Sequence, residues 1–162
     1  MHYEGNIIRP PSEADSIILQ VTVGCSHNAC TFCGAYRDKR FRIKEPEIVD
    51  EDIAFAARYC LRQKTVFLAD GNALAIPQPQ LVDLLARIRK KLPHVRRISL
   101  YANARDILER TPDELKTLRE LGLHRIYMGL ESGHDPTLKA IAKGNDSRSM
   151  ICLLYTSDAA DE

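Results

Sequence analysis

The apolar run Ile17-Ile-Leu-Gln-Val-Thr-Val23 leads directly into Gly24-Cys-Ser-His-Asn-Ala-Cys-Thr-Phe-Cys-Gly34. Its first part is rich in β-branched residues, which predicts a buried strand. Its second part places Cys25, Cys30 and Cys33 within nine residues. An iron–sulfur cluster is normally held by four cysteines, so three thiolates leave one iron without a protein ligand. The stretch therefore predicts a strand that carries a cluster with one open iron, which suits an enzyme better than an electron carrier.

The rest of the chain alternates helix-like and strand-like segments. Apolar residues at helical spacing predict helices over 47–63, 79–92, 111–122 and 135–144. Short apolar runs predict buried strands at 65–69, 97–102 and 124–130. The third helix carries a capping-box pattern of Thr111, Pro112 and Glu114, and Asp135 is expected to cap the fourth. About four βα units in succession predict an α/β fold with a parallel sheet, roughly half of an eight-unit barrel.

Composition and charge narrow the class of protein. The chain has 162 residues, enough for one core, and is 44% hydrophobic and 28% charged, as in a globular protein. A net charge of +1 does not indicate a nucleic-acid partner. No run reaches the roughly 18 apolar residues of a membrane span, and no secretory signal is visible at the N-terminus. The five unevenly spaced cysteines favour a reducing compartment, and we expect the protein in the cytoplasm.

The spacing Cys-x4-Cys-x2-Cys, with Phe32 before the last cysteine, resembles the cluster loop of the radical S-adenosylmethionine (radical SAM) superfamily. The usual family spacing is Cys-x3-Cys-x-aromatic-Cys, and a subgroup has one extra residue in the first gap, as here. The resemblance implies a partial (β/α) barrel and a 4Fe-4S cluster on Cys25, Cys30 and Cys33. The open iron would bind the amino and carboxylate groups of S-adenosylmethionine. Reduction, by an electron donor of the flavodoxin or ferredoxin type, would release a 5′-deoxyadenosyl radical that abstracts hydrogen from a substrate.

Polar residues and a glycine follow the next predicted strand, where α/β proteins bind their ligands. Asp70, Gly71 and Asn72 stand directly after the strand at 65–69. They occupy the place of the family's Gly-Gly-Glu motif, which meets the amino group of the cofactor. Here the acidic residue precedes the glycine and the second glycine is absent. The alternative for Asp70 is a plain Asp-Gly turn at a strand end.

Further candidates follow the later strands. The resemblance implies that the Asn103 amide contacts the cofactor carboxylate, and that Glu131 and Ser132 reach its ribose and methionine parts. A carboxylate suits that place because it can accept two hydroxyl hydrogens; the alternative is a helix cap. Phe32, and with it Tyr36, would bound the adenine pocket, with plain packing as the alternative.

Three other features have competing interpretations. His27 with the three cysteines could form a Cys3His zinc site, although four ligands from nine residues would strain tetrahedral geometry. Cys60 lies on the apolar stripe of a helix and is predicted to be a small core residue. The basic run from Arg37 to Lys44 is typical of a solvated loop; alternatively, its cations raise the potential of a nearby cluster.

These interpretations divide the chain into an N-terminal extension (1–15), a radical SAM core (16–151) and a tail (152–162). The tail continues no helical or strand pattern and resembles a translated sequencing-library adapter, with an ordinary disordered C-terminus as the alternative. We expect the natural protein to be longer and to hold the missing βα units. The predicted function is reductive cleavage of S-adenosylmethionine in an oxidoreductase-like reaction, of which coproporphyrinogen oxidation is an example. The alternatives are an RNA methylthio- or methyl-transferase and a zinc-binding module without catalysis.

Overall fold

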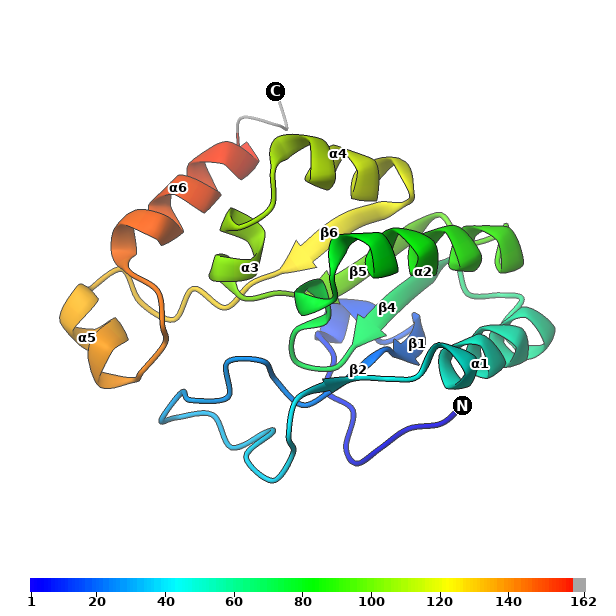
Figure 1. Ribbon diagram of the computed structural model, residues 1–162, viewed down its shortest axis with the longest axis horizontal. Coiled ribbons are helices and arrows are strands. Elements are labelled where there is room, and N and C mark those ends of the chain that lie inside the picture. Colours follow the sequence, from blue (N-terminus) through cyan, green and yellow to red (C-terminus); the bar gives the residue numbers. More distant parts are fainter. Residues whose placement is uncertain (159–162) are drawn as a thin grey trace.

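The computed structural model describes residues 1–158 and places a four-stranded parallel sheet at the centre of the protein (Figure 1). The strand order is β1-β4-β5-β6, so neighbours along the sheet follow one another in the chain apart from the small strands β2 and β3. The strands are β1 (Ile17–Gln20), β4 (Thr65–Ala69), β5 (Arg97–Tyr101) and β6 (Leu123–Tyr127). All three pairings are parallel. The predicted α/β fold with four βα units is confirmed.

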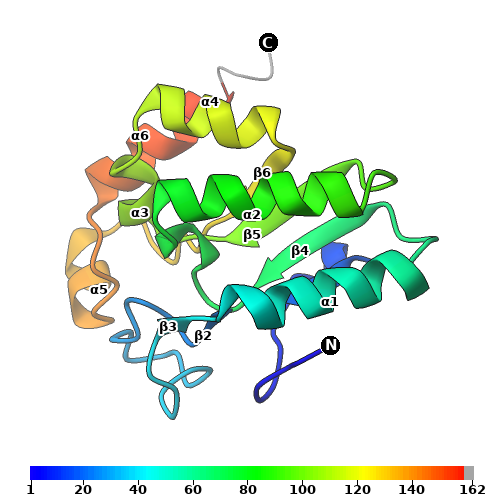
Figure 2. The same cartoon turned by 45° about the vertical axis from the view of Figure 1, so that its right-hand side comes forward.

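Three helices cover one face of the sheet (Figures 1 and 2). They are α1 (Pro46–Tyr59), α2 (Gln78–Lys91) and α4 (Pro112–Glu120), each with a proline in its first turn. Right-handed crossovers between neighbouring parallel strands place successive helices on the same side. The shorter elements are η1 (Pro11–Glu13), η2 (Ala73–Ala75), α3 (Ala104–Leu108) and α5 (Asp135–Ala140), followed by the last helix, α6 (Ser147–Asp158). No helix within residues 1–158 has the length and hydropathy to cross a bilayer.

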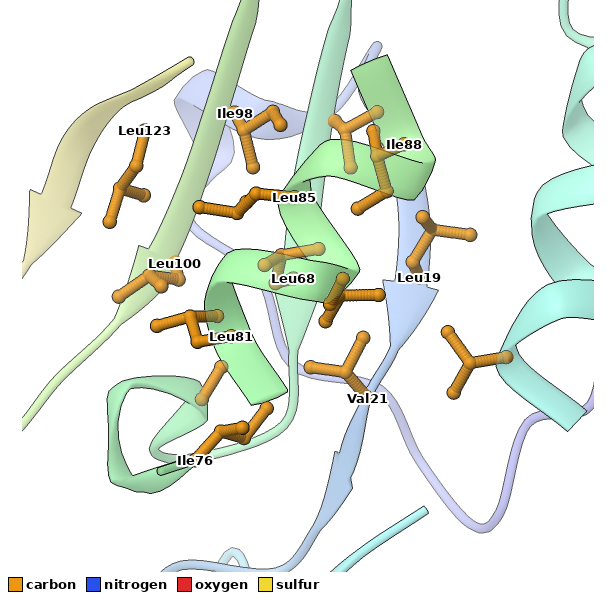
Figure 3. Packing of buried hydrophobic residues seen from close by; sticks show 14 of the residues in the cluster. Leu19, Val21, Leu68, Ile76, Leu81, Leu85, Ile88, Ile98, Leu100 and Leu123 are labelled. Atoms are coloured by element: carbon orange, nitrogen blue, oxygen red, sulfur yellow. The ribbon is translucent and has the colours of Figure 1, made fainter. Parts of the chain in front are cut away.

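The main core lies between α2 and the sheet (Figure 3). Leu81, Leu85 and Ile88 repeat at helical spacing on α2 and are fully buried. They pack over Leu68 of β4 and Leu100 of β5, which are also fully buried. Burial of each such side chain contributes about 1.5–3 kcal/mol. This packing fixes α2 on the sheet and so holds the carboxyl ends of β4 and β5 in place.

The predicted strand at 17–23 is divided in the structure. Residues 17–20 pair with β4, whereas β2 (Thr22–Val23) pairs antiparallel with β3 (Arg42–Ile43). Val21 lies at the division, because its N–H donates to Ala69 O (2.6 Å) while its carbonyl accepts from Lys44 N–H (3.0 Å). The chain therefore leaves the parallel sheet at Val21. The short β2–β3 ribbon carries the cysteine loop, residues 24–34, between its two strands.

Two helix starts were predicted, with different outcomes. The capping box of α4 is confirmed, since Thr111 Oγ1 accepts from Glu114 N–H (3.2 Å) and Glu114 accepts from Thr111 N–H (2.8 Å). The expected cap at Asp135 is wrong. His134 precedes α5, and Asp135 is the first residue of that helix. The Asp135 carboxylate instead accepts from Ser147 N–H (2.6 Å), which ties α5 to the start of α6.

The C-terminal part of the chain also differs from the prediction. Helix α6 continues through residues 152–158, where no helical pattern was expected, and it packs against α3. Its Met150 is 1% exposed, so a buried anchor near its start compensates for the weak apolar pattern. Residues 159–162 of the predicted tail lie outside the described residues. The proposed adapter origin of residues 152–162 stays a prediction.

The other face of the sheet meets the N-terminal segment. Phe67 alternates with the core residues Val66 and Leu68 and therefore points to this face, where its ring contacts Tyr101 and Tyr127. Glu13 of η1 is fully buried here and accepts from Tyr127 Oη (2.6 Å). Glu13 therefore anchors the N-terminal segment to this face.

Candidate functional site

The cysteine loop and the predicted cofactor residues start at the same edge of the sheet. Because the four strands are parallel, Asp70, Asn103 and Glu131 all follow the carboxyl ends of their strands. Cys25 comes two residues after β2. The cysteine loop lies beside α5 in both views (Figures 1 and 2). The structure therefore brings the predicted metal ligands and the predicted cofactor residues to one end of the molecule.

The three cysteines are partly exposed and form no disulfide among the described residues. Burial raises the pKa of the Cys30 thiol above its ordinary value. The positive charge of Lys143 lowers that pKa, while Cys25, Cys33 and Glu131 add to the rise. Each of these groups therefore lies within electrostatic reach of Cys30. A backbone hydrogen bond from Cys33 N–H to Cys30 O (3.3 Å) closes the turn between the last two cysteines.

The donor set fits a cluster on chemical grounds. Three accessible thiols on one loop are the ligands that iron–sulfur clusters use, and each thiolate would bind a different iron. The ligands of one zinc ion lie about 2.0–2.3 Å from it, and therefore close to one another. Within residues 1–158, no group of three or more His, Cys, Asp and Glu side chains meets the geometry of a single-ion site. His27 instead contacts Ala142 O through Nε2 (2.7 Å).

Asp70 lies beneath the cysteine loop and is fully buried. Its Oδ2 accepts from Gly24 N–H and from Gln20 Nε2, both at 3.3 Å, and forms an ion pair with Lys39 (3.7 Å). Its Oδ1 is buried and finds no hydrogen-bond partner among residues 1–158. The carboxylate therefore fixes the residue that precedes Cys25. The role of Asp70 on the cofactor's amino group stays a prediction.

Gly71 makes a close approach to the cysteine loop. Its N–H donates to Gly24 O (3.1 Å). A Cβ at this position would lie 2.7 Å from the Tyr36 ring and 3.0 Å from Cys25 Cβ. Position 71 therefore requires glycine, because the loop packs directly on its backbone. This close contact places Cys25 against the end of β4.

The two aromatic residues of the loop have different environments. Tyr36 is 6% exposed, and burial raises the pKa of its hydroxyl, with the charge of Asp70 adding to the rise. It therefore packs inside, as in the alternative interpretation. Phe32 is 55% exposed beside Cys33. Its predicted role beside adenine stays a prediction.

A polar network joins the cysteine loop to the ends of β4 and β5. The Asn72 side-chain amide donates to Ser26 Oγ (2.5 Å) and to Asp106 Oδ2 (2.8 Å). Asn103 N–H donates to Asn72 Oδ1 (3.3 Å), and Asn103 Nδ2 donates to Ser26 Oγ (3.4 Å). The sequence singled out Asn72 and Asn103 but missed Ser26 and Asp106, because nothing local marks hydrogen bonds between residues that lie over 30 positions apart.

The residues after β6 also lie at the edge of the sheet where the parallel strands have their carboxyl ends. Glu131 has a left-handed backbone (φ 62°), and its Oε1 pairs with Lys143 Nζ at 2.9 Å. Ser132 Oγ accepts from His134 N–H (3.1 Å), which fixes the turn into α5. Sequence analysis missed Lys143, which gave no signal beyond one more cation at a helix end. The roles of Glu131 and Ser132 toward the ribose and methionine parts of the cofactor stay predictions.

The basic run after the loop is exposed in part and buried in part. Arg37 donates to Cys33 O (3.1 Å) and to Thr31 O (2.6 Å), and so braces the loop from outside. Lys44 is buried and donates to His2 O. Lys39 is paired to buried Asp70, so the expectation of a solvated loop is wrong for Lys39 and Lys44, whereas Arg37 is exposed, as that expectation has it. Their contacts stabilise the path of the chain around the cysteines.

Comparison with known proteins gives matches in family, sequence and structure. A family model described as the radical SAM superfamily matches residues 19–159. The bacteriochlorophyllide d C-8(2)-methyltransferase of Chlorobaculum tepidum is 29% identical over 137 residues, which cover 80% of this chain and 29% of that protein. The 4′-phospho-dehydrooxetanocin synthase of Priestia megaterium is 24% identical over 159 residues, which cover 86% of this chain and 21% of that protein.

A solved structure of a radical S-adenosylmethionine enzyme also matches this chain. The cobalamin-dependent S-adenosylmethionine radical enzyme OxsB, with aqua-cobalamin bound, superimposes with a TM-score of 0.59 at 25% identity. That alignment covers 82% of this chain and 20% of OxsB. The chain thus spans less than a third of the length of the relatives it matches.

Proposed function

Because this chain belongs to the radical SAM superfamily, we propose that it forms the core of an enzyme that cleaves S-adenosylmethionine reductively. Cys25, Cys30 and Cys33 would hold a 4Fe-4S cluster. When bound, the cluster and S-adenosylmethionine supply a 5′-deoxyadenosyl radical that abstracts hydrogen from a second substrate. The electron would come from a reduced flavodoxin or ferredoxin, in a reducing compartment such as the cytoplasm.

The observation that carries this proposal is the attachment of a three-thiol loop to the carboxyl edge of a parallel sheet. Gly71 and Asp70 hold the loop through the two backbone groups of Gly24. The Asn72 amide holds it through Ser26. These contacts hold the start of the loop, on either side of Cys25, without a cofactor. Such preorganisation is what a protein contributes to cofactor chemistry.

The same edge offers groups for S-adenosylmethionine itself. The Glu131 carboxylate can accept hydrogen bonds from two ribose hydroxyls, and Ser132 is next to it. The Asn103 side-chain amide would contact the cofactor carboxylate, and Phe32, which is exposed, would lie beside adenine. Asp70 would bind the cofactor's amino group. Its contacts favour the alternative, in which it supports cofactor binding indirectly by holding the cysteine loop in place.

The names of the relatives support a small-molecule substrate over RNA. One relative is named as a methyltransferase on bacteriochlorophyllide d and the other as a synthase of 4′-phospho-dehydrooxetanocin. From the sequence resemblance, our first proposal is an oxidoreductase-type reaction on a porphyrinogen-like small molecule. The methyltransferase name makes methyl transfer to a small molecule the second candidate. Both reactions would use the same radical-generating core.

Anaerobic reconstitution with iron and sulfide tests the cluster. We expect about four irons per chain, visible charge-transfer absorption, and 5′-deoxyadenosine on reduction in the presence of S-adenosylmethionine. Single Cys25→Ala, Cys30→Ala and Cys33→Ala variants should lose the absorption. The matched control is Cys60→Ala, since Cys60 packs against the core away from the loop. Retention of the absorption and iron in the triple variant, or tight zinc without iron–sulfur absorption in the wild-type chain, would overturn the proposal.

A further inference from the structure

A cleft lined mostly by cations lies at the amino ends of the strands, opposite the ends that the strand arrowheads mark (Figure 1). Its volume is about 670 Å³, within the range of small-molecule sites. Its lining, which we call the cationic cleft, consists of Arg89, Arg96, Lys116, Arg119, Glu120 and His124. These residues come from α2, the turn before β5, α4 and β6. Tertiary packing thus brings four cations and a histidine together, against one carboxylate.

The four cations of the cationic cleft are exposed and unpaired. Within residues 1–158, none of them forms an ion pair or donates a side-chain hydrogen bond. By contrast, Arg87 on the neighbouring turn of α2 pairs with both Asp50 and Asp83. Lys116 and Arg119 are three positions apart on α4 and are therefore neighbours of like charge, which is unfavourable in an isolated helix. The grouping of these cations is therefore not explained by contacts within the chain.

The turn at Gly122 holds two of the lining side chains. Gly122 O accepts from Ile98 N–H (2.8 Å) and from His124 Nδ1 (2.7 Å). Because a carbonyl can only accept, His124 Nδ1 carries a proton, and its Nε2 has no hydrogen-bond partner among the described residues. Gly122 has a left-handed backbone (φ 101°), and a Cβ there would lie 3.3 Å from Arg89 Cδ. The glycine therefore lets Arg89 lie over the same turn that fixes His124.

Helix dipoles account for only part of this charge. Arg89 and Arg119 lie in the last turns of α2 and α4, where a cation is favourable. Lys116 lies in the middle of α4, and Arg96 lies between α2 and β5, so neither gains from a helix end. In (β/α) barrels the amino edge of the sheet contributes stability rather than catalysis, and unpaired like charges do not stabilise. A ligand with several negative charges would balance the whole group.

We propose that the cationic cleft is a second binding site, separate from the cysteine loop, for a compact small molecule that carries two or more phosphate groups. Guanidinium groups bind phosphate oxygens through paired hydrogen bonds, and an ammonium group adds a point charge. Convergence of cations from several elements on one cleft suits a compact anion. Nucleic-acid-binding domains are usually strongly basic, whereas this chain has a net charge of +1. The inference goes beyond the proposed function and does not depend on a cluster.

Isothermal titration calorimetry with inorganic triphosphate on the full chain, in a phosphate-free buffer of low ionic strength, tests the inference. We expect saturable binding of about one triphosphate per chain, and weaker binding of inorganic phosphate. The double variant Arg96→Gln/Arg119→Gln should bind triphosphate at least tenfold more weakly, as expected for loss of charge-assisted hydrogen bonds. The matched control, Lys139→Gln/Arg148→Gln, removes two exposed cations from α5 and α6 and should bind as the wild type does.

Nuclear magnetic resonance of the histidine rings locates the bound anion without relying on a cation variant. Triphosphate should shift the ring signals of His124, identified with His124→Gln, and leave those of His134 at the start of α5 unchanged. No saturable binding to the wild-type chain, an equal loss of affinity in the control variant, or shifts at His134 instead of His124 would overturn the inference. Tighter binding of a single-stranded RNA than of triphosphate, weakened by the same double variant, would replace the small-molecule site with a nucleic-acid surface.

Discussion

The backbone N–H of Gly24 donates a hydrogen bond of 3.3 Å to the carboxylate of Asp70, a residue 46 positions later in the chain. The bond links the residue before Cys25 to the residue after β4. Asp70 also pairs with Lys39, whose side chain is 14% exposed, on the far side of the same loop. One buried carboxylate therefore holds both the start of the cysteine loop and the segment that follows it.

Asp70→Asn should destabilise the chain and loosen the loop. The amide cannot balance the Lys39 charge, so we expect the free energy of unfolding to fall by about 2–4 kcal/mol. Iron bound per chain after reconstitution should also fall, because the loop is held less firmly. Urea denaturation and iron analysis measure the two effects. Asp38→Asn, an exposed carboxylate beside the same loop, is the control and should change neither. Wild-type values in Asp70→Asn would contradict the assigned role.

Gly71→Ala should impair cluster assembly, because the added methyl group would meet the Tyr36 ring and Cys25 Cβ. Either the loop or the strand end must shift, so Cys25 moves relative to Cys30 and Cys33. Iron content and visible absorption after reconstitution should both decrease. Gly34→Ala is the matched control, since a Cβ at position 34 meets no atom within 4 Å. Equal iron loading of the two variants would show that the close contact at position 71 does not matter.

Thr111→Ala should cost about 1 kcal/mol of stability through loss of the α4 cap. Two hydrogen bonds disappear or weaken, because Thr111 Oγ1 accepts from Glu114 N–H and Glu114 accepts from Thr111. Thermal or urea unfolding measures the change. Thr117→Ala in the middle of the same helix should be neutral or slightly stabilising, since alanine has the higher helix propensity. A larger loss at position 117 than at position 111 would contradict this prediction.

Glu13 should contribute to stability at neutral pH and lose that contribution in acid. Burial raises the pKa of its carboxyl, but hydrogen bonds from Ser16 and Tyr127 and the charge of Arg97 outweigh burial and lower the pKa below 4.5. A lowered pKa in the folded state means that the stabilisation is complete above about pH 4.5 and disappears as the pH falls through the folded value.

Glu13→Gln therefore should reduce the dependence of the unfolding free energy on pH in the acid range. Unfolding measured from pH 7 down to pH 3 should show the variant and the wild-type chain converging. Glu120→Gln, an exposed carboxylate on α4, is the control and should follow the wild-type slope. A wild-type slope in Glu13→Gln would count against the buried contacts of Glu13.

The sequence predicted the fold where local pattern is enough to specify it. The strand predicted at 65–69 has those bounds in the structure, and α2 differs from its prediction by one residue at each end. The capping box of α4 was also predicted, since all its atoms come from four neighbouring residues. Helix α6 was missed because its apolar pattern is weak and one buried residue, Met150, anchors its first turns.

The sequence by itself determined the cysteine spacing, the alternation of strands and helices, and the polar residues at strand ends, because each is a property of neighbouring residues. Only the tertiary structure decided that Asp70 lies beneath the loop, that Ser26 and Asp106 join Asn72, and that Lys143 meets Glu131. These contacts depend on strand register and on the path of two loops. Residues 12 to 46 positions apart carry no local sign of their partners, and packing of the sheet against its helices brings them together.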